Sequence, residues 1–167
     1  VDAPEAAEAL DDVRGRINHL VNNPGHTRPA TFHRRLGEIL YTGCGVSRSE
    51  AGLTRALEQV QELREEFWRD VRVTGTDDRL NQELEKAGRV ADFLELAELM
   101  ITDALDRQES CGAHFREEYA LPDGEAKRDD ERWCNVSAWE TNPAGQHRRY
   151  QEPLRFESVK LQVRNYR

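Results

Sequence analysis

The sequence has 167 residues, of which 37% are hydrophobic and 34% are charged, and its formal net charge is −8. This length suffices for one domain with a hydrophobic core, and the low apolar fraction favours amphipathic helices over a thick two-layer sheet. The acidic balance argues against nucleic acid as a partner and against direct contact with an anionic membrane surface. No apolar run approaches the roughly 18 residues of a transmembrane helix, so we expect no membrane span.

The first residues and the cysteines of the chain indicate in which cellular compartment the protein is found. Residues 1–4, Val-Asp-Ala-Pro, lack the basic and apolar regions of a signal peptide. We therefore expect a mature start or a cut made inside a longer chain. The three cysteines form an odd count at irregular spacing, which is not a disulfide framework and indicates a reducing cytoplasm.

Two amphipathic helices are predicted first. Pro4 suits the first turn of a helix, apolar residues recur at helical spacing as far as Leu20, and the turn-forming residues 22–25 end this helix. A second helix is predicted from Thr31, which suits a capping position, to Gly43.

Two longer helices are predicted next. Residues 47–50 form a capping-box pattern before a third helix that continues to Val71, and Gly75 breaks it. The fourth helix is predicted from about Asp78 to Arg107. It carries one apolar stripe made of Leu80, Leu84, Ala87, Ala91, Leu94 and Ile101, and a second made of Val90, Phe93, Ala97, Met100 and Ala104. Two stripes indicate burial on two sides, so this helix is predicted to be the central one of a bundle.

Helical periodicity ends at about Ser110, where glycine and proline become frequent. Two short runs, residues 133–140 and 154–163, predict strands. The predicted fold class is mainly α, with an antiparallel bundle of three or four helices over residues 1–110 and a loop-rich extension with two or three short β-strands over residues 111–167. This extension has little core of its own, so we expect it to pack on the bundle or on a domain outside this chain. The predicted bundle core is Leu57, Val60, Leu63, Leu84, Ala91, Leu94 and Ile101.

Three short patterns invite a chemical interpretation, and each is incomplete. Residues 43–48 have the form GxGxxR before a helix, but the preceding element is predicted to be helical and the third glycine of a dinucleotide fingerprint is absent. Cys111 and His114 form a CxxH pattern followed by Cys134 alone, without the paired motifs of a zinc site. The same Cys111 and His114 lack a third group that would orient a nucleophilic pair. We therefore expect no catalytic, cofactor-binding or metal-binding residue in this chain.

Two strings of arginine and acidic residues lie on either side of a loop. The first extends from Arg107 to Glu118 and the second from Arg128 to Arg132. Arginine forks matched with carboxylates are typical of a network that fixes a loop against a neighbouring surface. Ordinary surface ion pairs, worth roughly 0–1 kcal/mol each, are the alternative interpretation.

The same two strings carry a resemblance to a known family. Residues 107–119, RQESCGAHFREEY, resemble the motif R-x-E-S-R-G-x-H-x-R-x-D-Y of the succinate dehydrogenase/fumarate reductase flavoprotein subunits, and residues 128–133 resemble the R-D-D-E-x-W that follows it. Residues 36–40, 45–48 and 164–167 are similar to that family's L-G-x-I-M, G-V-x-R and R-x-Y-K motifs. The resemblance spans about residues 30–167.

Two features depart from the most familiar members of that family. Cys111 stands where those members carry arginine, and residues 120–127 lengthen the loop before Arg128. Both features are similar to the bacterial branch that works with menaquinone and a single cytochrome b membrane subunit. Because Cys111 removes a guanidinium group, no pairing made by that arginine is transferred to this chain.

The resemblance implies the C-terminal helical domain of such a subunit. Covalently bound FAD and the dicarboxylate site would lie in flavin and capping domains that precede it, so the chain alone is expected to carry no FAD and to turn over no succinate. The implied partners are those two domains, an iron–sulfur subunit and, indirectly, a cytochrome b membrane subunit at the inner, cytoplasmic face of the cell membrane. The alternatives are the equivalent domain of an L-aspartate oxidase and a stand-alone, non-enzymatic helical interaction module.

The candidate docking residues are His114, Arg116, Arg128, Asp129 and Asp130. Gly112 is expected to let the chain leave the long helix in a conformation that other residues resist. Buried ion pairs are costly without a complete network, so these groups are expected to be solvated or loosely paired in the isolated chain. On that expectation, His114→Ala or Arg116→Ala would barely change the melting temperature of this chain.

Overall fold

The computed structural model describes residues 3–76, 78–142 and 146–162. The helices of these residues are α1 (Pro4–Asn22), α2 (Pro29–Gly43), α3 (Glu50–Asp70), α4 (Gln82–Asp106) and the short α5 (Asp130–Trp133), with a 3-10 turn at Glu117–Tyr119. The strands are β1 (Ser47–Arg48), β2 (Phe115–Arg116), β3 (Asn135–Thr141) and β4 (His147–Pro153). Mainly α structure with short strands near the C-terminal end confirms the predicted fold class.

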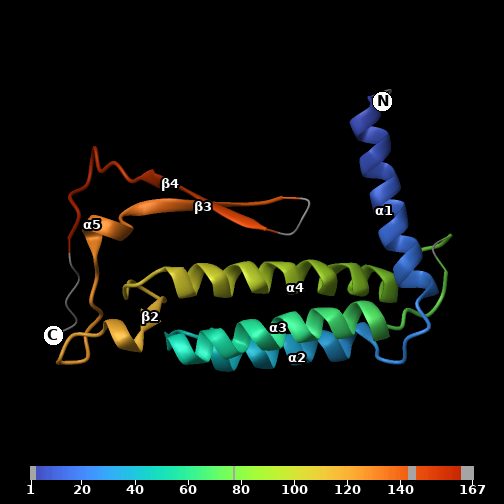
Figure 1. The fold of residues 1–167 in the computed structure, drawn as a ribbon, viewed down its shortest axis with the longest axis horizontal. Helices are drawn as coiled ribbons and strands as arrows, with labels where there is room; N and C mark the ends of the chain where they lie inside the picture. Colours follow the sequence, from blue (N-terminus) through green and yellow to red (C-terminus); the bar gives the residue numbers. More distant parts are fainter. Residues whose placement is uncertain (1–2, 77, 143–145, 163–167) are drawn as a thin grey trace.

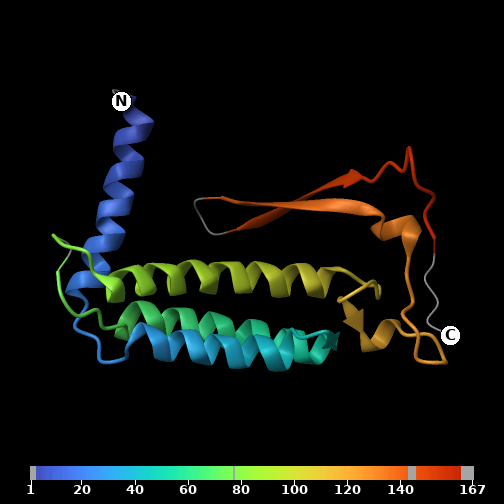
Figure 2. The same cartoon turned by 180° about the vertical axis from the view of Figure 1, so that it is seen from behind.

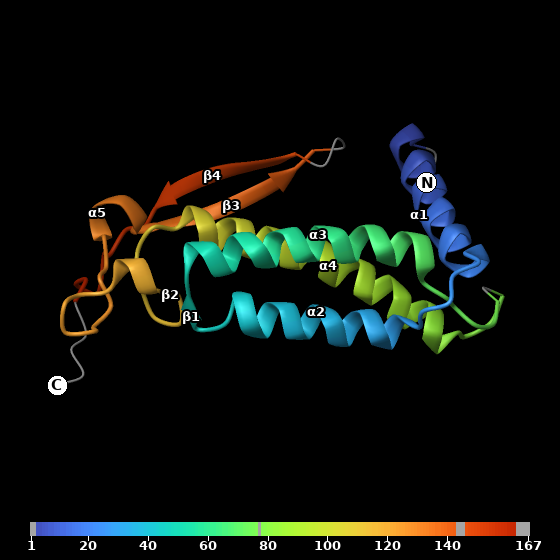
Figure 3. The ribbon, with the colours of Figure 1, turned by 60° about the horizontal axis from the view of Figure 1, so that its bottom comes forward.

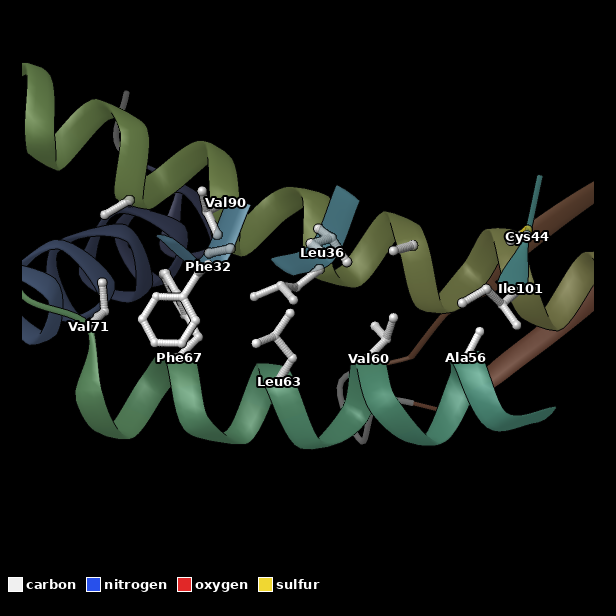
Figure 4. Close-up of a cluster of buried hydrophobic side chains, with 14 of the residues drawn as sticks. Phe32, Leu36, Cys44, Ala56, Val60, Leu63, Phe67, Val71, Val90 and Ile101 are labelled. Atoms are coloured by element: carbon white, nitrogen blue, oxygen red, sulfur yellow. The ribbon is translucent and has the colours of Figure 1, made fainter. Parts of the chain in front are cut away.

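Helices α2, α3 and α4 form an antiparallel three-helix bundle (Figures 1 and 3). Their facing sides build one core, in which Phe32 of α2 meets Phe67 of α3 edge to face at a centroid distance of 5.3 Å (Figure 4). At the end of α2, a Cβ added to Gly43 would lie 2.6 Å from the Cβ of Ala56, so glycine allows the two helices to approach closely. Small residues Ala87, Ala91, Ala97 and Ala104 line the buried side of α4.

Most of the predicted core is confirmed. Val60, Leu63, Ala91, Leu94 and Ile101 are buried, with no side chain more than 2% exposed. The two remaining members, Leu57 and Leu84, are only partly buried and pack against this core.

The second apolar stripe predicted for α4 is wrong in part. Val90, Ala97 and Ala104 are buried, but Phe93 is 41% exposed and Met100 is 47% exposed. The bundle neighbours α2 and α3 cover one broad side of α4, and the β-hairpin covers only part of the other side (Figures 1 and 2). The outer residues of α4 therefore remain accessible.

Helix α1 begins and ends where the sequence predicts, but it does not lie along the bundle. It projects from the bundle at a steep angle (Figure 1), and only Leu20 near its C-terminal end is buried. Its attachment is local: Arg16 forms an ion pair with Asp92 of α4 at 2.6 Å, and the His19 ring lies 2.9 Å from the carbonyl oxygen of Trp68. The bundle consequently has three helices, the lower of the two predicted numbers.

Three helix starts differ from the predicted positions. Helix α2 begins at Pro29 rather than after Thr31, because proline needs no N–H partner in the first turn. The cap of α3 is Ser49, whose hydroxyl accepts the N–H of Gly52, so residues 47–50 do not form a capping box. The cap of α4 is Asn81, whose side chain accepts two backbone N–H groups of the first turn.

Strands β3 and β4 pair as an antiparallel hairpin that lies on α4 (Figure 1). The Trp139 indole donates a 2.7 Å hydrogen bond to Asp103, and Arg149 forms an ion pair with Asp106. The strand predicted at residues 154–163 is wrong over residues 154–162, which form no strand, and Val163 lies outside the described residues. Strand β4 precedes that run. Its polar sequence, HRRYQEP, lacks the apolar alternation that predicts a strand because most of its side chains face solvent.

Candidate docking site at the end of the bundle

The two charged strings meet at the end of the bundle where α4 stops, and we call residues 107–119 and 128–132 the polar corner. The chain turns back at Gly112, whose positive φ of 59° is the conformation predicted for it. Backbone hydrogen bonds between Cys111 and His114 close this turn. Strand β2 then pairs in parallel with β1, which places Arg116 opposite Arg48. The polar corner therefore ties the end of α4 to the start of α3.

Arg116 is buried inside the polar corner. Its side chain is 1% exposed and donates to the carbonyl oxygens of Ala104 at 2.9 Å and Leu105 at 3.2 Å, at the C-terminal end of α4. Its Nε pairs with Glu118 at 3.1 Å, and its backbone exchanges two hydrogen bonds with the hydroxyl of Ser110. A cation at this place satisfies carbonyl groups that the helix leaves free and complements the helix dipole. The expected solvation is therefore wrong for Arg116, which braces this domain internally.

His114 joins two arginines across the polar corner. Arg48 donates to its Nδ1 at 2.9 Å, so the Nε2 carries the proton and donates to the carbonyl oxygen of Arg107 at 3.0 Å. Burial lowers the pKa of His114, and the positive charges of Arg48, Arg107 and Arg116 lower it further, against the opposing effect of the Arg107 carbonyl. His114 is thus held in its neutral form by the protein around it.

Two glutamates that the docking assignment omitted connect the parts of the polar corner. Glu109 is 2% exposed; it accepts two hydrogen bonds from Arg107 and a third, at 2.9 Å, from the backbone N–H of Asp129. Glu118 accepts the backbone N–H of Glu50 at 2.6 Å, at the first turn of α3. Burial opposes ionisation of Glu118, but the N–H donors and Arg116 lower its pKa overall. The signal that could have identified both residues is that each follows an arginine by two positions.

Arg128, Asp129 and Asp130 lie at the outer edge of the polar corner. Arg128 forms a pair with Asp130 at 2.6 Å, which raises the pKa of Arg128, and it also donates to the carbonyl oxygen of Gln162. The side chain of Asp129 caps α5 by accepting the N–H of Arg132 at 3.2 Å. These three residues are more accessible than Arg116 and lie on the segment nearest the C-terminal tail.

The CxxH and GxGxxR patterns of the sequence have structural roles. Both ring nitrogens of His114 are occupied by arginine partners, so this ring does not face the thiol of Cys111 as a base. Residues 43–48 comprise the end of α2, a turn at residues 44–46 and β1, and Arg48 donates to the carbonyl oxygen of Gly45 at 2.6 Å. A dinucleotide-binding turn follows a strand, whereas this turn follows a helix, and Arg48 occupies its Gly45 carbonyl oxygen. The residues present therefore do not fit a dinucleotide. Over the described ranges, no three His, Cys, Asp or Glu side chains gather as metal ligands do.

One further property concerns membranes. Across residues 3–76, 78–142 and 146–162, the helices are too short or too polar to span a bilayer.

Sequence comparison places this chain among known proteins. The family model described as "Fumarate reductase flavoprotein C-term" matches residues 33–166. The fumarate reductase flavoprotein subunit of Proteus vulgaris is 30% identical over 162 residues, which cover 95% of this chain and 25% of that protein. The corresponding subunit of Escherichia coli K12 is 34% identical over 118 residues, which cover 71% of this chain and 19% of that protein. The chain spans about a quarter of the length of these relatives.

Structural comparison agrees. A variant of Escherichia coli quinol fumarate reductase superposes on 96% of this chain with a TM-score of 0.79 and 28% identity, and the match occupies 27% of that chain. Adenylylsulfate reductase of Archaeoglobus fulgidus, at 17% identity and a TM-score of 0.70, shares the fold alone. Because the family model covers most of the sequence and the superposition covers nearly all of the fold, the chain belongs to the family of fumarate reductase flavoprotein C-terminal domains.

Proposed function

We propose that this chain is the C-terminal helical domain of the flavoprotein subunit of a succinate dehydrogenase or fumarate reductase. Its role is structural: it supports the subunit and contributes to docking, and it is not catalytic alone. The observation that carries the proposal is the family match over residues 33–166. The superposition on quinol fumarate reductase supports it, because the bundle and the extension match together.

In this proposal the chemistry belongs to other parts of the assembly. FAD and the dicarboxylate site lie in flavin and capping domains that precede this one, and succinate and fumarate are interconverted there. The electrons of this reaction are exchanged with quinone elsewhere in the complex. The iron–sulfur subunit is the direct partner subunit, and a cytochrome b membrane subunit follows it. The complex would sit on the cytoplasmic, inner face of the cell membrane.

The docking role falls to the outer edge of the polar corner. Arg128, Asp129 and Asp130 are its candidate contacts with a neighbouring domain or subunit, because they are partly exposed and held in place by Glu109 and the α5 cap. His114 and Arg116 do not contact the partner in this proposal. They stabilise the polar corner from inside and so help to hold its outer edge in place.

The test is to tag the gene for this sequence at its 3′ end and purify its product from the cells that express it. The proposal predicts a polypeptide about four times as long as this chain, with bound flavin, that co-purifies with an iron–sulfur protein and reduces fumarate or oxidises succinate with an artificial dye. A tagged product no longer than this chain and free of flavin would contradict it and would favour a stand-alone interaction module.

A further inference from the structure

A short pair of strands joins the start of α3 to the end of α4 (Figure 3). We call residues 45–50 and 111–118, which lie on its two sides, the seam. Strands β1 and β2 pair over two residues each, and the N–H of Phe115 donates to the carbonyl oxygen of Val46 at 3.1 Å. A strand pair this short makes few hydrogen bonds, so it can open locally while the helices stay folded.

The His114 side chain connects the two sides of the seam with the end of α4. Its Nδ1 accepts a hydrogen bond of 2.9 Å from Arg48 across the seam, and its Nε2 donates to the carbonyl oxygen of Arg107 at 3.0 Å. The Nε of Arg48 is itself fixed, because it donates to the carbonyl oxygen of Gly45 at 2.6 Å. A guanidinium group can only donate, so the bond across the seam exists only while Nδ1 of His114 carries no proton. A proton on Nδ1 would set two N–H donors against each other and break this bond.

Among the described residues, the charges that act on the pKa of His114 are all positive. They belong to Arg48 of β1, Arg107 directly after α4 and Arg116 of β2. The neighbouring carboxylates of Glu109 and Glu118 each pair with one of these arginines. The carboxylate of Glu117 accepts the hydroxyl of Ser47 at 2.8 Å. Burial and the three positive charges lower the pKa of His114, so the closed seam disfavours the protonated ring.

We infer that the seam is a proton-sensitive switch, closed while His114 is neutral and open when Nδ1 of this ring takes up a proton. Opening separates β1 from β2 and so releases the start of α3 from the end of α4. The rest of the polar corner has independent bonds: Ser110 donates its N–H to the carbonyl oxygen of Lys127 at 2.9 Å, and Asp129 donates its N–H to Glu109 at 2.9 Å. The change is therefore confined to the seam. Every contact in it lies within this chain, so the switch does not depend on the proposed function.

The size of the pH effect on the seam has an upper limit. In the open seam the ring of His114 takes its ordinary pKa of 6.5, whereas in the closed seam its pKa is lower. The contribution of His114 to closing is therefore fully present above pH 6.5 and is lost as the pH falls below that value. If the closed seam admits no proton at all, the ratio of closed to open molecules falls about 25-fold between pH 7 and pH 5.

Amide hydrogen exchange followed by mass spectrometry tests the switch in the protein as the expressing cells make it. Exchange is measured at about pH 7 and pH 5, and each rate is compared with the intrinsic rate at the same pH, so the effect of pH on the exchange chemistry cancels. We expect the protection of the peptide that contains Phe115 to fall on the order of tenfold, and by no more than about 25-fold. Urea at about 1 M should leave this protection unchanged and lower that of the α3 core, because local opening exposes little surface.

The first variant for this experiment is His114→Gln, because glutamine retains one acceptor and one donor but does not titrate. Its seam should keep the same protection at both pH values, to within about twofold. The matched control is His33→Gln, at an exposed histidine of α2, which should show the full fall. A second variant, Arg48→Met, leaves His114 titratable but removes the opposing donor. Its fall in protection should be smaller than that of the unaltered protein.

Three results would overturn the inference. They are a fall of less than about twofold in the unaltered protein, a fall that persists in His114→Gln, and seam protection that drops with urea as steeply as that of the α3 core. If His114→Gln leaves the seam unprotected even at pH 7, Arg48→Met decides: a fall as large as that of the unaltered protein would also overturn the inference. None of these results depends on bound flavin or on a partner subunit, so the proposed function is tested separately.

Discussion

At the scale of single residues, the polar corner is an internal brace more than a free surface. Arg116 neutralises the end of α4 and reaches Glu118, while His114 lies between Arg48 and Arg107. The sequence motif correctly located this cluster, but residue types alone do not show which members are buried. Burial depends on the parallel pairing of β1 with β2, which brings together segments almost 70 positions apart.

Arg116→Ala is predicted to lower the free energy of unfolding of the domain by about 3 kcal/mol. It removes a buried cation and leaves two carbonyl groups of α4 without a donor. Urea unfolding of the variant measures this change. The matched control is Arg89→Ala, because the Arg89–Glu85 pair is exposed and worth roughly 0–1 kcal/mol. Equal effects of the two substitutions would show that Arg116 is not a brace.

Acidification is predicted to destabilise the domain through His114. Its pKa in the folded state is lowered below the ordinary value of 6.5, so its contribution is fully present above pH 6.5 and is lost as the pH falls below that value. His114→Gln should therefore reduce the loss of stability between about pH 7 and pH 5, measured by urea unfolding at each pH. His33→Gln, at an exposed histidine of α2, is the control and should leave that loss unchanged. An unaltered pH profile for His114→Gln would count against the neutral form of this ring.

At the scale of secondary-structure elements, the sequence predicts which segments form helices, but it predicts how these helices pack only in part. The ends of α1 and α2 follow from turn residues such as Asn22 and Gly43, and the core positions of α3 and α4 follow from periodicity. The start of α2 differs because Pro29 takes the first helical position, ahead of Thr31. The start of α3 differs because Ser49, and not Ser47, caps the helix. Amphipathic spacing could not reveal that α1 projects from the bundle, because the pattern gives the apolar face of a helix and not the surface that the face meets.

The core side of α4 is expected to dominate its contribution to stability. Leu94 is fully buried, so Leu94→Ala should cost roughly 2–5 kcal/mol of unfolding free energy. Leu96→Ala, two residues away and 52% exposed, should cost no more than about 1 kcal/mol in the isolated chain. Thermal and urea unfolding of the two variants compare these values directly. A large loss for Leu96→Ala in the isolated chain would place Leu96 in a core that the structure does not show.

The hairpin is predicted to depend on one side-chain anchor. Trp139→Phe keeps an aromatic ring but removes the indole donor to Asp103, a bond to a carboxylate worth about 1.5–3 kcal/mol. Faster amide hydrogen exchange across β3 and β4, with unchanged exchange in α3, is the expected result. Unchanged exchange in the hairpin would mean that the Arg149–Asp106 pair holds it without Trp139.

At the scale of the whole molecule, the chain combines a well-packed bundle with apolar surface that the described residues leave exposed. The bundle core is continuous from Leu20 to Ala104. Large hydrophobic residues of α1 and of the outer side of α4 are exposed, and the indole N–H of Trp133 has no hydrogen-bond partner among the described residues. This arrangement suits a domain whose task is to support a larger subunit. Under the proposed function, the residues that perform oxidation and reduction lie outside residues 1–167.

Flavin content and dye-coupled activity of purified residues 1–167 test this division of labour most directly. We expect a folded helical protein that shows no flavin absorbance and neither reduces fumarate nor oxidises succinate, while the complete subunit binds flavin and interconverts the two dicarboxylates. Stoichiometric flavin bound to residues 1–167 alone, or turnover of either dicarboxylate by them, would contradict it.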